Sequence, residues 1–228
     1  MAKHFTLYSS FYKEESQEQP VSNLDPRYIL AIDLGTSSCK VALLSSRGQI
    51  LGSASAPVPL ILLPAGGVEQ DPEAWWAAIK RATQELLSQG VVSPAAIAAV
   101  CCTAQWSGTV AVDAQGQHLH NAIIWMDARG ARYVQQMTGG LFKINGYGVD
   151  KLWHWLRRTG GIPTRSGKDP IAHILYLKHE APAIYQQTYQ FLEPKDYLNL
   201  RLTGKFAASK ESITLHWVTD NRDINQIE

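Results

Sequence analysis

The stretch YILAIDLGTSSCKVALLSSRGQIL, residues 28–51, decides the fold. An apolar run over residues 28–32 leads into Asp33 and a turn of small residues, and residues 40–44 then alternate in polarity as a second strand does. A third apolar segment follows the turn at residues 47–48. The pattern predicts an antiparallel β-meander whose first turn is acidic and rich in glycine and hydroxyl groups.

The first turn has the composition of a phosphate-binding loop. Backbone N–H groups and hydroxyls can donate hydrogen bonds to a phosphate, and a neighbouring carboxylate can hold a divalent cation. The residues concerned are Asp33, Gly35, Thr36, Ser37 and Ser38. An ordinary hairpin, in which Asp33 and Ser37 satisfy turn hydrogen bonds, explains the same residues. The motif alone leaves both interpretations open.

Composition indicates a globular protein that acts on small molecules. The chain has 228 residues, 45% of them hydrophobic and 18% charged, which suffices for one sizeable core or two small ones. Its net charge of +1 gives no reason to expect nucleic acid or an anionic membrane as a partner. No run reads as a signal peptide or a membrane span, so we expect a cytoplasmic location. Cys39, Cys101 and Cys102 are expected to be reduced thiols in the core.

The next signals along the chain are a helix and two strands. Asp71 is placed to cap a helix that Pro72 begins and Gly90 ends. Residues 97–103 then read as a buried strand, with residues 109–113 as its neighbour. Before the meander, residues 1–26 form a polar amino-terminal extension, which leaves residues 27–228 as one domain.

Polar and aromatic side chains gather where two predicted strands end. They come from the segments TAQWSG, residues 103–108, and IIWMDARG, residues 123–130. Carboxylates and guanidinium groups form paired hydrogen bonds with vicinal hydroxyls, and an indole ring stacks on the apolar face of a sugar. The candidate ligands are Gln105, Trp106, Ser107, Asp127 and Arg129. A surface ion pair between the last two, with the tryptophans filling the core, is the alternative.

Five segments in a fixed order resemble one family. The segments DLGTSSCK, EQDPEAWW, AQWSG, WMDAR and EPKDYLNLRLTG together resemble the amino-terminal half of an FGGY-family carbohydrate kinase, in its xylulokinase-like branch. The resemblance implies an α/β domain of the RNase H-like actin fold, with a mixed sheet flanked by helices. This fold is shared by sugar kinases, heat-shock chaperones and actin, and the resemblance assigns it to residues 27–228.

The resemblance also implies an activity and a cofactor. The function would be ATP-dependent phosphorylation of a ketose or related sugar, with Mg²⁺ positioned by Asp33. The ATP phosphates would be faced by Gly35, Thr36, Ser37, Ser38 and Lys40, and the sugar by Gln105, Trp106, Ser107, Asp127 and Arg129. The adenine site and the catalytic aspartate would belong to a second domain that these 228 residues do not include, so no catalytic residue is expected within them.

Other functions stay open at this point. A truncated or regulatory domain that binds a sugar or a partner without catalysis has the same motifs, and an actin-like ATPase shares DLGTSS. After LTG the chain reads KFAASKESIT, which departs from the family pattern. Trp106 and Ser107 replace the methionine-histidine pair of many xylulokinases, so the sequence does not decide which sugar is bound. A second kinase domain and a homodimer are both compatible with it as protein partners.

Overall fold

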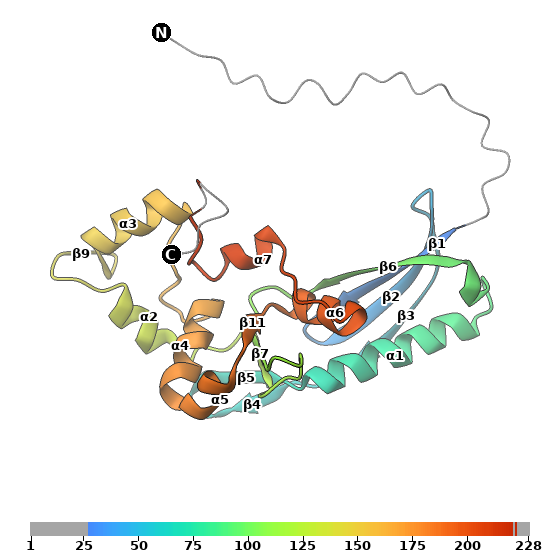
Figure 1. Ribbon diagram of the computed structural model, residues 1–228, viewed down its shortest axis with the longest axis horizontal. Helices are drawn as coiled ribbons and strands as arrows, with labels where there is room; N and C mark the ends of the chain where they lie inside the picture. Colours follow the sequence, from blue (N-terminus) through green and yellow to red (C-terminus); the bar gives the residue numbers. More distant parts are fainter. Residues whose placement is uncertain (1–26, 221, 223–228) are drawn as a thin grey trace, which may run out of the picture.

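The structure is a computed structural model that describes residues 27–220 and 222. The polar extension predicted for residues 1–26 lies outside these residues. Figure 1 shows an elongated molecule, with a twisted sheet and one long helix at one end and a group of shorter helices at the other. No helix in the described part has the length and apolar character that a bilayer crossing requires.

The main sheet has four strands in the spatial order β3-β2-β1-β6. These strands are β1 (Tyr28–Leu34), β2 (Ser38–Ser45), β3 (Ile50–Pro57) and β6 (Ile97–Ala104). The first three are antiparallel neighbours, which confirms the predicted meander, and β6 runs parallel to β1. Because β1 and β6 are parallel, their carboxyl ends meet at one edge, where Asp33 lies level with Thr103.

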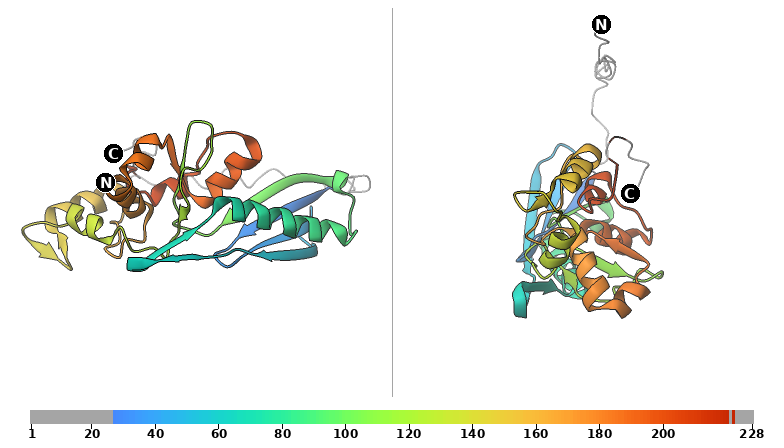
Figure 2. Two further views of the ribbon diagram at one scale, coloured as in Figure 1. Left: turned by 90° about the horizontal axis from the view of Figure 1, so that it is seen from below. Right: turned by 90° about the vertical axis from the view of Figure 1, so that its left-hand side faces the viewer.

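Helix α1 (Pro72–Ser88) covers one face of this sheet and packs on β2 and β3 (Figure 2). It begins as predicted, because the Asp71 side chain accepts a hydrogen bond of 2.8 Å from the Glu73 N–H and Pro72 occupies the first turn. Its buried side carries Trp75, Ala78, Ile79, Ala82 and Leu86. They share one core with the apolar residues of β1 and β2 that point toward the helix.

The other half of the molecule is built from short elements. Strand β5 (Gly67–Gln70) lies between β4 (Ile61–Leu63) and β8 (Ala122–Ile123), and β7 (Val110–Val112) pairs with β11 (Gln190–Leu192). A small hairpin joins β9 (Lys143–Ile144) to β10 (Tyr147–Gly148). The helices are α2 (Ala131–Met137), α3 (Val149–Thr159), α4 (Pro170–Glu180), α5 (Pro182–Gln187), α6 (Pro194–Thr203) and α7 (Lys210–Thr214). Helix α6 returns to the main sheet and packs on β6.

Two predictions about the strands and one about the thiols are wrong. Residues 97–103 do form a strand, but β6 is an edge strand with residues 98–101 exposed. The predicted neighbour of this strand, β7, pairs with β11 instead of β6. Cys101 is correspondingly exposed, whereas Cys39 is buried; all three cysteines are free. An apolar run fixes the strand, but what pairs with it or covers it depends on elements far away in the sequence.

The core beneath α1 sets the stability of the domain. We expect Leu86→Ala to lower the free energy of unfolding by about 2–5 kcal/mol, because Leu86 is fully buried against the sheet and its loss leaves a cavity. Urea unfolding followed by circular dichroism measures the change. The matched control is Leu62→Ala on β4, where the side chain is 72% exposed and a change within about 0.5 kcal/mol is expected. Equal effects of the two substitutions would contradict this packing.

Candidate functional site

A cavity of about 730 Å³ opens at the edge where β1 and β6 end. This volume lies within the range of small-molecule sites. Six of the predicted site residues line it, namely Asp33, Gly35, Thr36, Gln105, Trp106 and Ser107. The remaining wall comes from Ala104, Trp125, Thr164, Ser166, Lys168, Asp169, Leu215 and Trp217. The structure therefore brings the first turn and the loop after β6 into one site.

The first turn has unused backbone donors at the edge of this cavity. The Gly35 N–H donates to the Ser38 carbonyl oxygen at 3.0 Å, which closes the turn. Among the described residues, no hydrogen bond uses the N–H of Thr36 or Ser37. The carboxylate of Asp33 is exposed and has no hydrogen-bond or ion-pair partner in the same part of the chain. The turn can thus offer two N–H groups to an anion beside a carboxylate.

This arrangement fits Mg²⁺ better than a metal held by protein alone. Among residues 27–220 and 222, no three His, Cys, Asp or Glu side chains gather into a metal cluster. Mg²⁺ keeps several waters and binds through one or two carboxylates plus substrate phosphates. A single free carboxylate, Asp33, beside an anion-binding turn supplies that kind of donor set.

Three predicted residues of the first motif lie outside the cavity lining. Ser37 and Ser38 use their backbone carbonyls to accept hydrogen bonds from Val58 and Gly35. Lys40 is exposed on β2, directly opposite Asp33 in the antiparallel register. Cross-strand neighbours of this kind point to the same face of a sheet. Lys40 therefore stands beside the cavity, within the reach of a long side chain.

Gln70 joins the two loops to the rest of the fold. Its side chain is fully buried at the end of β5. The Gln70 amide nitrogen donates to the Thr36 carbonyl at 2.7 Å, and its amide oxygen accepts from Gln105 at 2.5 Å and from the indole of Trp75 at 3.1 Å. The Thr36 hydroxyl also lies 3.3 Å from the Gln105 amide oxygen. The side-chain amide of Gln70 thus holds together the 34–38 turn, the 105–108 loop and α1.

Indole rings form much of the cavity wall. Trp106 is 67% exposed, Trp125 donates from its ring nitrogen to the Thr36 hydroxyl at 3.0 Å, and Trp217 donates to Asp169 at 3.1 Å. Ser107 and Trp217 have positive φ angles of 61° and 58°. Positive φ is uncommon for residues other than glycine and is concentrated at functional sites. The wall therefore combines flat apolar faces with backbone held in a strained form.

Asp127 and Arg129 do not line this cavity, and Arg129 instead lines a separate hollow beside Tyr176 and Glu180. Asp127 is buried and accepts from the Val68 N–H at 2.8 Å and from Arg129 Nε at 2.9 Å. Arg129 also bonds Glu69 at 2.6 Å and the Tyr176 hydroxyl at 3.0 Å. Burial disfavours the charged guanidinium and by itself would lower the pKa of Arg129. The hydrogen bonds with Asp127 and Glu69 outweigh this effect, so the pKa is raised. The pair is buried, unlike a surface ion pair, and its predicted contact with a sugar stays a prediction.

Glu193 holds the Gln105–Gly108 loop through a hydrogen bond to its backbone. It is buried, and its Oε2 accepts from the Gly108 N–H at 3.2 Å. A Cβ atom at position 108 would lie 2.5 Å from the ring of Pro194, so only glycine fits there. Burial raises the pKa of Glu193 to about 8, Asp196 adds to the rise, and the loop N–H groups and Lys195 oppose it.

Several wall residues were missed from the sequence. Lys168, Asp169 and Trp217 belong to none of the segments from which the site was predicted. Asp169 does precede Pro170 at the cap of α4, but its carboxylate accepts from Thr164 N–H and the Trp217 indole instead of capping the helix. An aspartate before a helix-starting proline was the available clue, and it is equally typical of an ordinary cap.

Removing the Gln70 amide tests its role. We expect Gln70→Leu to lower the free energy of unfolding by at least about 2 kcal/mol, because the buried Trp75 N–H and the Thr36 carbonyl lose a partner. Amide hydrogen exchange at residues 34–38 and 105–108 should become faster as both loops loosen. Gln84→Leu, exposed on α1, is the control. Unchanged exchange in the two loops would contradict the assigned role.

The raised pKa of Glu193 predicts a pH-dependent stability. Between pH 4.5 and about 8 the folded carboxyl keeps its proton while the unfolded one ionises, so the free energy of unfolding falls as pH rises. Glu193→Gln cannot ionise and should lose this fall, on the order of 1 kcal/mol per pH unit. Urea unfolding from pH 5 to 8 measures it, with Glu85→Gln, exposed on α1, as control. Parallel pH profiles for wild type and Glu193→Gln would show that Glu193 ionises normally.

Comparison with known proteins gives a consistent family. Residues 28–220 match the model of the amino-terminal domain of the FGGY family of carbohydrate kinases. Xylulose kinase of Bacillus subtilis (strain 168) is 32% identical over 178 residues, covering 78% of this chain and 33% of that protein. Glycerol kinase of Stenotrophomonas maltophilia (strain R551-3) is 43% identical over 103 residues, covering 45% of this chain and 21% of the relative.

The fold comparison agrees. The crystal structure of xylulose kinase from Lactobacillus acidophilus superposes with a TM-score of 0.74 at 24% identity, covering 89% of this chain and 38% of the other. The predicted α/β fold, that of the actin-like ATPases with a mixed sheet flanked by helices, is confirmed. The chain spans about a third of the length of the curated xylulose kinases it matches. It belongs to the FGGY family of carbohydrate kinases and contains the amino-terminal domain of that family.

Proposed function

We propose that this chain forms the sugar-binding and first phosphate-binding half of an ATP-dependent carbohydrate kinase. The observation that supports this most directly is the shared cavity of the 34–38 turn and the 105–108 loop. Because Thr36 and Gln105 also contact one another, a phosphate at the turn and a hydroxyl at the loop would lie close together. Phosphoryl transfer depends on positioning of this kind.

Each part of the cavity has a proposed role. Trp106 and Trp125 offer apolar faces to the carbon chain of the sugar, and Gln105 and Ser107 offer polar atoms to its hydroxyls. The N–H groups of Thr36 and Ser37 hold phosphate oxygens, with Gly35, Ser38 and Lys40 shaping and charging the same corner. Asp33 holds Mg²⁺, which when bound neutralises charge on the phosphates. Asp127 and Arg129 are proposed to lie near the sugar, because they belong to the same segment as Trp125, which lines the cavity.

The remaining groups of the reaction are assigned outside these residues. The matched xylulose kinases are more than twice as long as this chain, so we infer that adenine binding and proton removal from the sugar hydroxyl belong to a second kinase domain. A ketose is favoured as substrate because the relatives that match most of the chain are xylulose kinases. Since ATP would be the phosphoryl donor, we place this activity in the cytoplasm. A sugar-binding domain without catalysis is the alternative.

Ligand-induced stabilisation tests the site directly. Thermal unfolding of the chain is measured with D-xylulose, D-ribulose, glycerol and gluconate in turn, and with MgATP. A ligand at about a hundredfold excess over its Kd should stabilise the fold by about 2.7 kcal/mol. We expect one sugar or polyol to raise the Tm and Trp106→Ala to abolish that rise, because Trp106 lines the cavity.

The control is Trp153→Ala, a tryptophan equally exposed but on α3, away from the cavity lining. This variant should keep the full response to the sugar. A cooperative melt that no sugar shifts would contradict a formed sugar site and favour a domain that binds a protein partner. A sugar response without a response to MgATP would agree with the assignment of adenine binding to a second domain.

A further inference from the structure

The outer end of the α3 region carries a large exposed apolar surface, which we call the α3 patch. Figure 1 shows α3 at one end of the molecule and the main sheet with α1 at the other. Leu141 is 91% exposed, Phe142 76% and Trp153 67%. The whole patch consists of Leu141, Phe142, Ile144, Val149, Trp153 and Leu156. Contiguous exposed apolar surface of this kind is typical of an interaction site.

The members of the patch are neighbours. The Val149 N–H donates to the Phe142 carbonyl at 3.0 Å, which ties the start of α3 to the segment before β9. Leu141, Phe142, Val149 and Trp153 line one shallow hollow of about 660 Å³. None of these residues lines the sugar cavity. The patch is therefore a separate surface with a depression that a side chain from another molecule can enter.

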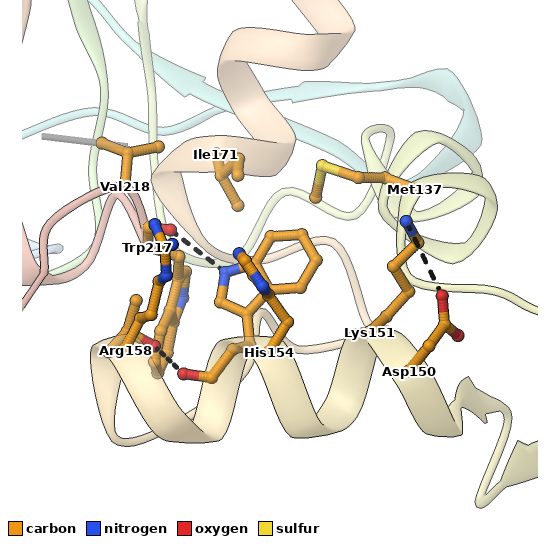
Figure 3. A pocket seen from close by; sticks show the side chains of 10 residues that line it. Met137, Asp150, Lys151, His154, Arg158, Ile171, Trp217 and Val218 are labelled. Atoms are coloured by element: carbon orange, nitrogen blue, oxygen red, sulfur yellow. Dashed lines mark hydrogen bonds and ion pairs between the residues drawn. The ribbon is translucent and has the colours of Figure 1, made fainter.

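Helix α3 has two distinct sides. Val149, Trp153 and Leu156 follow a spacing of four and then three residues, so they form one outward stripe. Figure 3 shows the other side, where Lys151, His154 and Arg158 point toward a second hollow beside Trp217 and Ile171. The apolar stripe is thus not needed to pack the helix onto its own domain.

Two opposite charges flank the stripe on the same side. Asp150 and Arg157 are seven residues apart, close to two full turns, so they project in nearly the same direction. The Asp150 carboxylate is 72% exposed and pairs only loosely with Lys151 at 3.9 Å. Arg157 is exposed near the other end of the helix. One flank of the stripe is therefore negative at its start and positive at its end.

This charge order is complementary to itself. When two copies of a helix pack antiparallel about a two-fold axis, the same flank of each helix faces that of its partner, with the order reversed. Residue 150 of one copy then lies opposite residue 157 of the other. A parallel pair related by a two-fold axis would bring different flanks together and would gain nothing from these charges.

We propose that the α3 patch is the interface of a symmetric dimer of this chain. The α3 helices pack antiparallel, with Trp153 near the two-fold axis. Asp150 pairs with Arg157 of the partner subunit, and Arg157 pairs with Asp150 of the partner subunit. The apolar stripe supplies most of the buried surface, and the two charge pairs set the direction of packing. The proposal stands independently of the kinase activity.

Charge reversal tests this interface. Sedimentation analysis over about a hundredfold range of protein concentration should show a reversible dimer of the 228-residue chain. Asp150→Arg and Arg157→Asp should each weaken dimerisation about tenfold or more, because symmetry turns two attractive pairs into two repulsive ones. The double variant Asp150→Arg/Arg157→Asp restores both pairs and should recover the wild-type dissociation constant within about threefold. Trp153→Ala should also favour the monomer.

The control is Glu85→Arg, which makes the same change in net charge as Asp150→Arg on the exposed side of α1. It should leave dimerisation unchanged, and circular dichroism should show that every variant is folded. A chain that stays monomeric at all concentrations overturns the proposal and leaves the patch to a different protein. A double variant that dissociates as readily as the single ones excludes the antiparallel pairing.

Discussion

The buried amide of Gln70 is the constraint on which the site depends. An amide removed from water costs several kcal/mol unless its hydrogen bonds are replaced. Here both N–H donors are used, toward the carbonyls of Thr36 and Pro59, and the oxygen accepts from Trp75 and Gln105. This side chain has no further capacity, so moving any of its partners would leave a buried polar atom unpaired.

The neighbours of Gln70 show how separate sequence segments are joined in the fold. Successive residues of a strand point to opposite faces, so Glu69 and Gln70 on β5 serve different partners. Glu69 binds Arg129 of the WMDAR segment on one face, and Gln70 binds the 34–38 turn and the 105–108 loop on the other. Asp71, the next residue, caps α1. Three consecutive side chains therefore connect α1, the 105–108 loop and Arg129.

Sequence reasoning succeeded where the cause is local. The meander follows from alternation and turn residues, and the start of α1 follows from Asp71 and Pro72. It failed where the cause is distant. Nothing near β6 reveals that it would be an edge strand, and nothing near Arg129 reveals that Glu69 and Tyr176 would enclose it. Family resemblance identified six of the fourteen residues that line the cavity, but the walls contributed from residues 164–169 and 215–217 depend on long-range packing.

Trp217 shows how such packing can connect distant parts of the domain. Its ring donates to Asp169, its carbonyl accepts from the Trp155 indole at 3.1 Å, and its ring leaves no room for a Cβ at Gly161. These contacts hold a residue whose positive φ is costly by itself. Since Trp155 belongs to α3 and Trp217 lines both the cavity and the hollow beside α3, the position of this helix and the shape of the cavity are linked. A change in how α3 packs would therefore alter the wall of this cavity through a single indole.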